Sequence, residues 1–333
     1  MREIKVEKNE AGQRLDKLLR KYLKAANSGF IYKMLRKKNI VLNDRKASGE
    51  EILMQGDSVK MYFSEDTFAV MTAGNAESRK EKDGRKLPKL RDYIIYEDAD
   101  ILLVNKPAGW LSQGDGSEAV SVNELCIAYL AESGQLTEEQ LKTFKPGIAN
   151  RLDRNTSGII LFGKSLPALQ CLAGMLRDRS LKKYYCAVTE GSINEKNEIH
   201  AFLKKDEKTN RVTVKETEFE GAGRIDTAYV PKYCGKLPDG TAYTVLRVHL
   251  ITGKTHQIRA HLASTGHPVV GDSKYGEKKL NLYVRKLYGI HSQLLHAEEI
   301  VFPDLSGTVL AALSERTFRA PLPETFYPFV KSN

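Results

Sequence analysis

The residues best suited to chemistry lie at positions 150–158, in the segment NRLDRNTSG. Asp153 stands between Arg151 and Arg154, just before two hydroxyl residues and a glycine, and an apolar run follows at 159–162. Neighbouring guanidinium and hydroxyl donors hold a carboxylate ionised, as a carboxylate nucleophile requires. Taken alone, the segment fits an ordinary loop of surface ion pairs equally well, and that simpler interpretation would be preferred.

A second segment, residues 250–263, reads LITGKTHQIRAHLA. A strand is expected to end at 252–253, and Thr255 to cap a helix whose first turns carry basic side chains: Lys254, His256 and Arg259. Helix N-termini with basic neighbours attract anions, either a phosphate or the carboxylate of Asp153. A capped structural helix is the plainer alternative.

A third segment, residues 182–188 (KKYYCAV), has the composition of a strand. Alternation places Tyr185 and Ala187 on one face, and Tyr184 and Cys186 on the other. A tyrosine in a sheet is core material more often than a platform for a base, so this segment carries little weight alone.

Common catalytic motifs are missing from the sequence. It has no GxxxxGK[ST], GxGxxG, GxSxG or HExxH pattern. His256 and His261 are five positions apart, not the four that would place two imidazoles on one helix face. We therefore expect no redox cofactor, no nucleotide cofactor and no catalytic metal.

Length and composition indicate a globular protein of two or three domains. The chain has 333 residues, of which 41% are hydrophobic and 28% charged, with a mean hydropathy of -0.41. No apolar stretch approaches the roughly 18 residues of a membrane span, and the N-terminus lacks the apolar segment of a secretion signal. The four cysteines form no CxxC pair. We expect a cytoplasmic protein with reduced thiols and no membrane partner.

The positive charge is concentrated near the N-terminus. The chain has 52 Lys and Arg against 42 Asp and Glu, a net charge of +10, and residues 1–63 hold 15 basic and 8 acidic side chains, a net +7. Such asymmetry indicates a module that binds a polyanion. Nucleic acid is favoured over a membrane because no amphipathic anchor accompanies the charge.

Within residues 1–63 the pattern predicts a small α+β domain. Apolar residues at 15, 18, 19, 22 and 23 predict one helix. Ser28 is expected to cap a second helix, with Ile31, Met34 and Leu35 inward and three candidate RNA-binding cations outward, namely Lys33, Arg36 and Lys37. Short strands are expected at 40–42 and 58–63. A merely solvated basic face remains the alternative.

Residues 64–92 lack periodicity and are expected to form a flexible basic linker. Beyond them, strands are predicted at 101–104, 158–162, 184–189, 211–215, 228–233 and 243–250, and helices at 122–131, 166–177 and 255–264. Because the strands come in consecutive groups, the sequence predicts an α+β domain over residues 93–333, with a mixed or antiparallel sheet.

Together, these segments resemble the RluA-type pseudouridine synthases. The resemblance rests on RLDRNTSG at 151–158, KYYCA at 183–187, TGKTHQIRAHLA at 252–263 and GHPVVGD at 266–272, with ILLVNKPAG at 101–109 as the opening segment. Residues 11–63, with GQRLDKLL at 12–19 and LRKKNIVLN at 35–43, look like an S4-type RNA-binding domain. The chain departs from the usual pattern at Asn150, where a histidine is common, and at Lys254, where an arginine is common.

The resemblance implies a mostly antiparallel sheet with a central cleft, and isomerisation of uridine in RNA, most often large-subunit ribosomal RNA, to pseudouridine. Asp153 is then the nucleophile, attacking either the ribose C1′ or the pyrimidine ring. Arg259 pairs with it, Tyr185 packs against the base, and Arg151 fills the gap left by the flipped nucleotide, with Lys254 a further RNA contact. Transfer RNA as substrate, or an inactive RNA-binding protein that assists ribosome assembly, are the alternatives.

Overall fold

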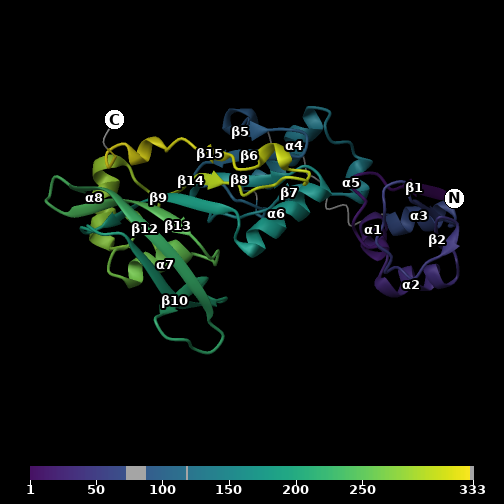
Figure 1. Ribbon diagram of the computed structural model, residues 1–333, viewed down its shortest axis with the longest axis horizontal. Coiled ribbons are helices and arrows are strands. Elements are labelled where there is room, and N and C mark those ends of the chain that lie inside the picture. Colours follow the sequence, from purple (N-terminus) through teal and green to yellow (C-terminus); the bar gives the residue numbers. More distant parts are fainter. Residues whose placement is uncertain (73–87, 118, 331–333) are drawn as a thin grey trace. The chain divides into compact units, whose positions relative to one another are not determined.

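The computed structural model describes residues 1–72, 88–117 and 119–330, which form two compact units (Figure 1). The first unit comprises residues 1–91, 125–147 and 163–171, and the second comprises residues 92–124, 148–162 and 172–333. Among the described residues, no helix combines the length and apolar character that crossing a bilayer requires.

The N-terminal part of the first unit is a four-stranded antiparallel sheet covered by helices. Its strand order is β1 (Arg2–Lys5), β4 (Ser58–Met61), β2 (Ile40–Leu42) and β3 (Arg45–Lys46). The helices are α1 (Leu15–Tyr22) and α2 (Ser28–Arg36). Leu15, Leu18 and Leu19 are fully buried, as the helical spacing of apolar residues predicts.

Helix α2 confirms the expected inward and outward faces but begins differently from the prediction. Ile31 and Leu35 are buried in the core, whereas Lys33, Arg36 and Lys37 are exposed. The cap is Asn27, not Ser28: its side-chain oxygen accepts a hydrogen bond of 2.8 Å from the backbone N–H of Phe30. Asn27 has extended backbone angles, from which an amide oxygen reaches the third helical residue.

The expected flexible linker is wrong for its first residues, which form helix α3 (Glu65–Thr72). Phe68 is fully buried, lies 5.2 Å from the Phe63 ring and has the Arg2 guanidinium 4.5 Å above its own ring. Phe68 is the one buried side chain of this short helix. A single buried residue produces no hydrophobic periodicity in the sequence, so the helix could not be predicted. The expected linker residues 73–87 lie outside the described part.

The first unit also takes in segments that the sequence places in the catalytic part. The Thr143 hydroxyl, at the end of α5 (Gln140–Thr143), donates to Glu10 Oε1 at 2.6 Å. The Gln170 amide, in α6 (Leu166–Asp178), donates to the carbonyl of Gly12 at 3.3 Å. The two compact units therefore do not meet simply at the expected domain boundary between residues 63 and 93. Hydrogen bonds between distant segments leave no local sequence pattern.

The second unit is built on an eleven-stranded mixed sheet, which confirms the predicted fold class (Figure 1). The order is β11 (Arg211–Lys215), β10 (Asn197–Asp206), β12 (Gly223–Lys236), β13 (Ala242–Leu250), β9 (Lys182–Glu190), β14 (Leu295–Val301), β8 (Ser157–Gly163), β6 (Ile101–Lys106) and β5 (Ile94–Glu97), with β15 (Thr317–Arg319) on β14 and β7 (Gly147–Ile148) on β8. In this order, each pair of neighbours from β11 to β14 is antiparallel, and β8 lies parallel to β14.

The remaining helices are α4 (Val122–Glu132), α6, α7 (Gln257–Ser264) and α8 (Lys278–Tyr288), with short 3-10 turns at Leu90–Tyr93, Ala311–Leu313 and Glu324–Phe326. Helix α7 contacts β10, β11 and β12 of the sheet. Every residue of β8 is buried, as its continuous apolar run predicts. The segment that carries Asp153 leads directly into β8, so the C-terminal end of that segment is anchored in the core.

Candidate active site

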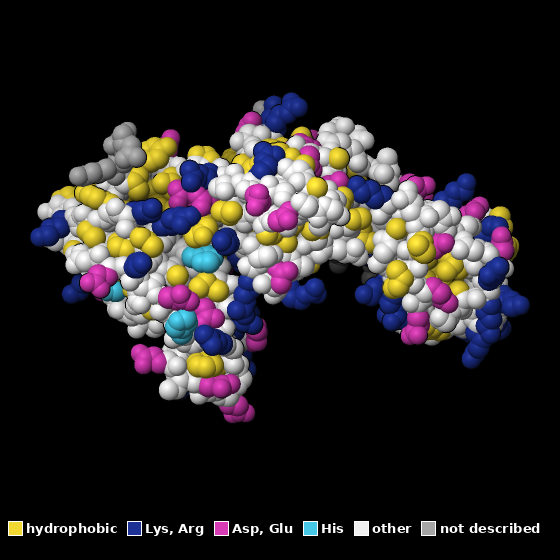
Figure 2. Space-filling model, viewed as in Figure 1, with side chains coloured by type: hydrophobic (Ala, Val, Ile, Leu, Met, Phe, Trp, Pro, Cys, Tyr) yellow, Lys and Arg dark blue, Asp and Glu magenta, His cyan; other side chains and the backbone are white. Residues whose placement is uncertain are grey.

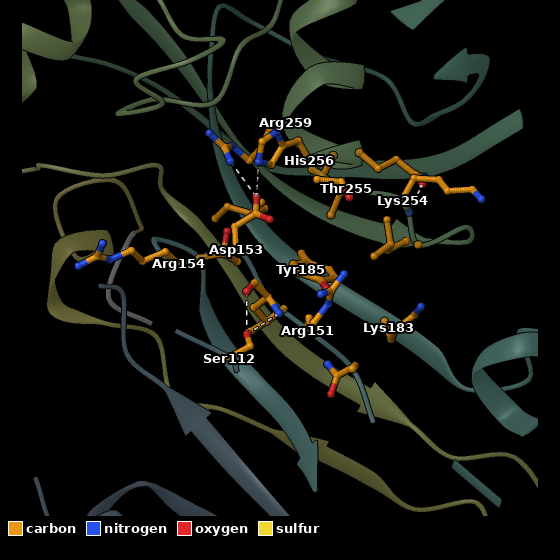
Figure 3. A pocket seen from close by; sticks show the side chains of 18 of the residues that line it. Ser112, Arg151, Asp153, Arg154, Lys183, Tyr185, Lys254, Thr255, His256 and Arg259 are labelled. Carbon is orange, nitrogen blue, oxygen red and sulfur yellow. Dashed lines mark hydrogen bonds and ion pairs between the residues drawn. The ribbon is translucent and has the colours of Figure 1, made fainter. Parts of the chain in front are cut away.

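A cleft of about 1120 Å³ opens in the second unit, between the segment before β8 and the β13–α7 connection (Figure 3). It brings together residues 111–115, 149–156 and 250–259, which are far apart in sequence. Among the described residues that line it are nine Lys or Arg side chains and two carboxylates, those of Asp115 and Asp153. Such an excess of positive charge favours an anionic ligand.

At the centre of the cleft, Arg259 links two carboxylates. Its Nη1 donates to Asp153 Oδ2 at 2.8 Å, while Nε and Nη2 donate to Asp272 Oδ2 and Oδ1 at 2.6 and 2.9 Å. Asp272 is fully buried, whereas the Asp153 side chain is 27% exposed. The guanidinium is therefore fixed from behind by one carboxylate and offers its remaining edge to the other.

The charges of Asp272, Arg259 and Asp153 stabilise one another. Burial opposes ionisation of Asp272, but the hydrogen bonds from Arg259, with those from the backbone N–H groups of Lys274 and Tyr275, lower its pKa below the ordinary value. Burial likewise opposes the charge of Arg259, yet Asp272 and Asp153 raise its pKa above the ordinary value. Asp153 thus faces a permanent cation.

The segment that carries Asp153 is held on both sides by groups from β6 and its following turn. The Ser112 hydroxyl donates to the carbonyl of Leu152 at 2.7 Å and accepts from its N–H at 2.9 Å. The buried Lys106 ammonium donates to the carbonyls of Arg154, Pro107 and Trp110 at 2.9 to 3.0 Å. The backbone on each side of Asp153 is therefore clamped.

The same segment is also tied to the strands beneath it. The Asn150 side chain donates to the carbonyl of Ile159 and accepts from the N–H of Leu161 on β8, at 3.2 and 2.8 Å. Gln293 donates to the Thr156 hydroxyl at 3.1 Å. Asn150, where a histidine is common in the resembled family, thus has a structural role here.

His256 completes the surroundings of Asp153. Its Nε2 lies 3.9 Å from Asp153 Oδ2, and its Nδ1 lies 2.9 Å from the Tyr275 hydroxyl. The geometry is that of a carboxylate with polar donors on one oxygen and an open cleft beside it. Such an arrangement suits nucleophilic attack on a neutral or anionic substrate held by cations.

Comparison with known proteins agrees with this geometry. Residues 100–264 match the family model described as RNA pseudouridylate synthase. A Vibrio vulnificus protein named ribosomal large subunit pseudouridine synthase C is 30% identical over 300 residues, covering 90% of this chain and 87% of the relative. The chain belongs to the RNA pseudouridylate synthase family. It is an RNA pseudouridine synthase, as its resemblance to the RluA type predicted, and it isomerises uridine in RNA to pseudouridine.

Two further comparisons support this placement. The Escherichia coli (strain K12) ribosomal large subunit pseudouridine synthase C is 29% identical over 306 residues, covering 90% of this chain and 88% of the relative. The solved structure of human RNA pseudouridylate synthase domain containing 4 aligns with a TM-score of 0.55 at 19% identity, over 71% of this chain and 91% of that chain. The human structure supports the fold alone.

Within this synthase, the structure brings most of the predicted site residues together. Asp153, Arg259, Tyr185, Arg151 and Lys254 all line the cleft (Figure 3). Their catalytic and binding roles stay predictions. The remaining candidates lie in the other unit, Lys33 and Arg36 on α2 and Lys37 directly after it, where Figure 2 shows Lys and Arg side chains at the surface.

Tyr185 lies on β9 opposite Val248 of β13, and its ring is buried at the wall of the synthase cleft. Burial, together with the Asp153 carboxylate, raises the pKa of its hydroxyl above the ordinary value. The phenol is therefore neutral at physiological pH. In that form it can pack against a base and relay a proton, but it is not a phenolate base.

The start of α7 differs from the prediction that Thr255 caps this helix. The helix begins at Gln257, and His256 precedes it in a left-handed conformation with φ 53°. Gln257 Oε1 accepts the Thr252 hydroxyl at 2.8 Å and the Lys254 N–H at 3.1 Å. This glutamine, rather than a capping threonine, organises the connection, so Lys254 precedes the helix instead of lying in its first turn.

Sequence reasoning missed four residues that shape the synthase site: Lys106, Ser112, Asp272 and Tyr275. Asp272 and Lys106 lie in segments that were quoted for the family resemblance, but no role was assigned to them. Ser112 and Tyr275 carried no signal at all. The described residues hold no group of three or more His, Cys, Asp and Glu side chains that could bind a metal ion.

Proposed function

We propose that this synthase modifies uridine in large-subunit ribosomal RNA, in the cytoplasm, with Asp153 as nucleophile. Two relatives that each span 90% of the chain are named ribosomal large subunit pseudouridine synthase C, which supports this RNA as substrate. The observation that carries the catalytic assignment is the Arg259–Asp153 contact of 2.8 Å inside a cation-lined cleft.

The net reaction moves the attachment of the uracil base to the ribose C1′ from N1 to C5. The Asp153 carboxylate contributes an electron pair to a carbon of the nucleotide, and that bond is broken again before product leaves. The N1–C1′ bond breaks, a C5–C1′ bond forms, the proton on C5 is released, and N1 gains a proton. Atoms and electrons balance without a redox partner, because reactant and product are isomers.

The other side chains act on the uridine before and during this step. Arg259 holds Asp153 charged and oriented through a charge-assisted hydrogen bond. Tyr185 packs against the target base. Arg151 is exposed at the cleft, and its planar guanidinium can stack in the gap left when the nucleotide leaves its helix. Extrusion costs a few kcal/mol, so a group that fills the gap favours the bound state.

RNA binding draws on cations in both units. Lys254 and the half-buried Lys183 are among the residues that line the cleft (Figure 3). In the first unit, the exposed Lys33, Arg36 and Lys37 contact phosphates as part of an S4-like domain. A ribosome assembly intermediate is the proposed natural partner.

Mapping pseudouridine in ribosomal and transfer RNA from cells with and without the gene tests this proposal. We expect one or a few pseudouridines in large-subunit RNA to disappear, and to return with the wild-type gene but not with an Asp153→Asn gene. Loss confined to transfer RNA would overturn the substrate assignment. An unchanged map in both RNAs would overturn the function itself.

A further inference from the structure

The two oxygens of the Asp153 carboxylate have different surroundings. Oδ2 receives the 2.8 Å hydrogen bond from Arg259 Nη1 and also faces His256 Nε2 at 3.9 Å (Figure 3). Within the described residues, no hydrogen bond reaches Oδ1. Oδ2 thus accepts one hydrogen bond and has a second nitrogen nearby, while Oδ1 is left for the substrate.

We propose that His256 is a second positioning residue for Asp153, which presents Nε2–H to Oδ2 so that Oδ1 is the oxygen that attacks the nucleotide. This inference rests on the proposed nucleophilic role of Asp153. His256 acts through the carboxylate and needs no contact with the RNA. It adds to the contact from Arg259, which alone would leave the carboxylate free to rotate about that bond.

The backbone at His256 is held in an unusual conformation. Its φ and ψ are 53° and 15°, in the left-handed region that residues other than glycine adopt uncommonly, although histidine, asparagine and aspartate do so more often than the rest. The side chain is only 7% exposed. A histidine in this conformation must be held by its surroundings, and the contacts at both ring nitrogens are the specific ones that the structure provides.

In the proposed arrangement, Tyr275 selects which ring nitrogen of His256 carries the proton. The Tyr275 oxygen accepts a 3.0 Å hydrogen bond from the Val212 N–H, and its phenolic proton is donated to His256 Nδ1, which lies 2.9 Å from that oxygen. The neutral ring then carries its proton on Nε2. The opposite tautomer would turn the Nε2 lone pair toward the Asp153 carboxylate, which is electrostatically unfavourable.

The surroundings also keep the imidazole neutral. Burial lowers the pKa of His256 below its ordinary value, and Arg259 and Lys274 act in the same direction, whereas Asp153 and Asp272 oppose them. A neutral N–H donor orients Asp153 without neutralising it, whereas an imidazolium would form a second ion pair with the nucleophile. At 3.9 Å the contact is longer than a hydrogen bond, and such contacts commonly tighten when substrate binds.

Single-turnover tritium release, with enzyme in saturating excess over RNA that carries 5-tritiated uridine and comes from cells that lack the gene, tests this role. We expect His256→Leu to slow the rate about tenfold or more, as the loss of one preorganised donor does elsewhere. His256→Gln, whose amide can donate from a similar position, should restore most of the rate, and Tyr275→Phe should be intermediate. The RNA dissociation constant should stay within about twofold throughout.

Several outcomes would overturn the inference. One is a His256→Leu rate within twofold of wild type, and another is a Gln variant as slow as the Leu variant although both melt like wild type. If the Leu variant does not fold, a wild-type rate for Tyr275→Phe has the same meaning. The exposed His291→Gln is the control. Failure of wild-type enzyme itself to release tritium would instead overturn the proposed function.

A spectroscopic measurement is independent of turnover. The ¹⁵N resonances of histidine-labelled enzyme, assigned with the His256→Gln variant, should show His256 neutral and protonated at Nε2 near pH 7. A ring protonated at Nδ1, or at both nitrogens, would contradict the proposal.

Discussion

Arg259 is anchored to Asp272 by two hydrogen bonds, of 2.6 and 2.9 Å, and reaches Asp153 through only one, of 2.8 Å. The fully buried Asp272 is therefore the residue that fixes the guanidinium, and Asp153 is the residue that uses it. This division lets the 27% exposed Asp153, the proposed nucleophile, remain accessible while its cation stays in place.

Replacing Asp272 by asparagine should uncouple the guanidinium from its anchor. Because Asp272→Asn leaves the buried Arg259 without its main counter-charge, we expect the free energy of unfolding to fall by about 3 kcal/mol or more. The single-turnover rate should fall at least tenfold. Urea unfolding and tritium release measure the two effects, with the exposed Asp239→Asn as control. Wild-type stability would contradict the anchoring role.

Removing the Ser112 hydroxyl should loosen the backbone beside Asp153. Ser112→Ala leaves the buried N–H and C=O of Leu152 without their partners, which costs about 1 to 3 kcal/mol. The turnover rate should fall more than the RNA affinity, since the segment binds little but positions Asp153. Denaturant unfolding and single-turnover rates measure this, with the exposed Ser306→Ala as control. Equal unfolding free energies and equal turnover rates for the two variants would refute the proposal that Ser112 fixes the backbone beside Asp153.

Acidification should destabilise the strand pair beneath the site through His296. Its Nε2–H donates to the Ala320 carbonyl and its Nδ1 accepts from the Ser157 hydroxyl, and burial lowers its pKa to about 4. Between pH 6.5 and 4 the unfolded chain binds more protons at this residue than the folded protein does, so stability decreases as the pH falls. The slope from one histidine is at most about 1.4 kcal/mol per pH unit.

A His296→Gln variant should therefore lose stability less steeply than wild type between pH 6.5 and 4. Urea unfolding at pH 7, 6 and 5 gives the two slopes. Identical slopes would mean that the pKa of His296 is the same in the folded and the unfolded protein, which would contradict the prediction. The buried His261, whose pKa burial also lowers to about 4, contributes to both proteins alike and cancels in the comparison.

The basic surface of α2 should determine part of the salt dependence of RNA binding. Each neutralised phosphate contributes about 0.7 to 0.9 to the slope of log affinity against log salt. Changing Lys33, Arg36 and Lys37 together to glutamine should thus flatten the slope by about two to three units. The matched control changes three exposed lysines of α8: Lys278, Lys279 and Lys286. The same change in slope from both sets would show that only net charge matters.

Much of the fold and the centre of the site could be predicted from the sequence. Periodicity located α1 and α2, and continuous apolar runs located the buried strands such as β8. Asp153 and Arg259 were identified because their surrounding motifs combine, and the structure places them 2.8 Å apart. A catalytic motif of this kind can be recognised because its residues are close together in the sequence.

The parts that were missed depend on contacts between distant segments. Ser112 contacts Leu152 across 40 positions, and Lys106 reaches the Arg154 carbonyl across 48. Neither residue type is unusual in its own neighbourhood. The left-handed conformation of His256 is likewise imposed by its contacts, and it shifts the start of α7 in a way that helix propensity does not indicate.

The most direct test of the account is tritium release by the Asp153→Asn variant, on RNA that carries 5-tritiated uridine. Asparagine keeps the size of the side chain but is a far weaker nucleophile than a carboxylate, and the nucleophile acts in the covalent step rather than in ground-state binding. We predict no release above background, with the dissociation constant for RNA within a few-fold of wild type. Release at a near wild-type rate would contradict the assignment of Asp153 as the nucleophile.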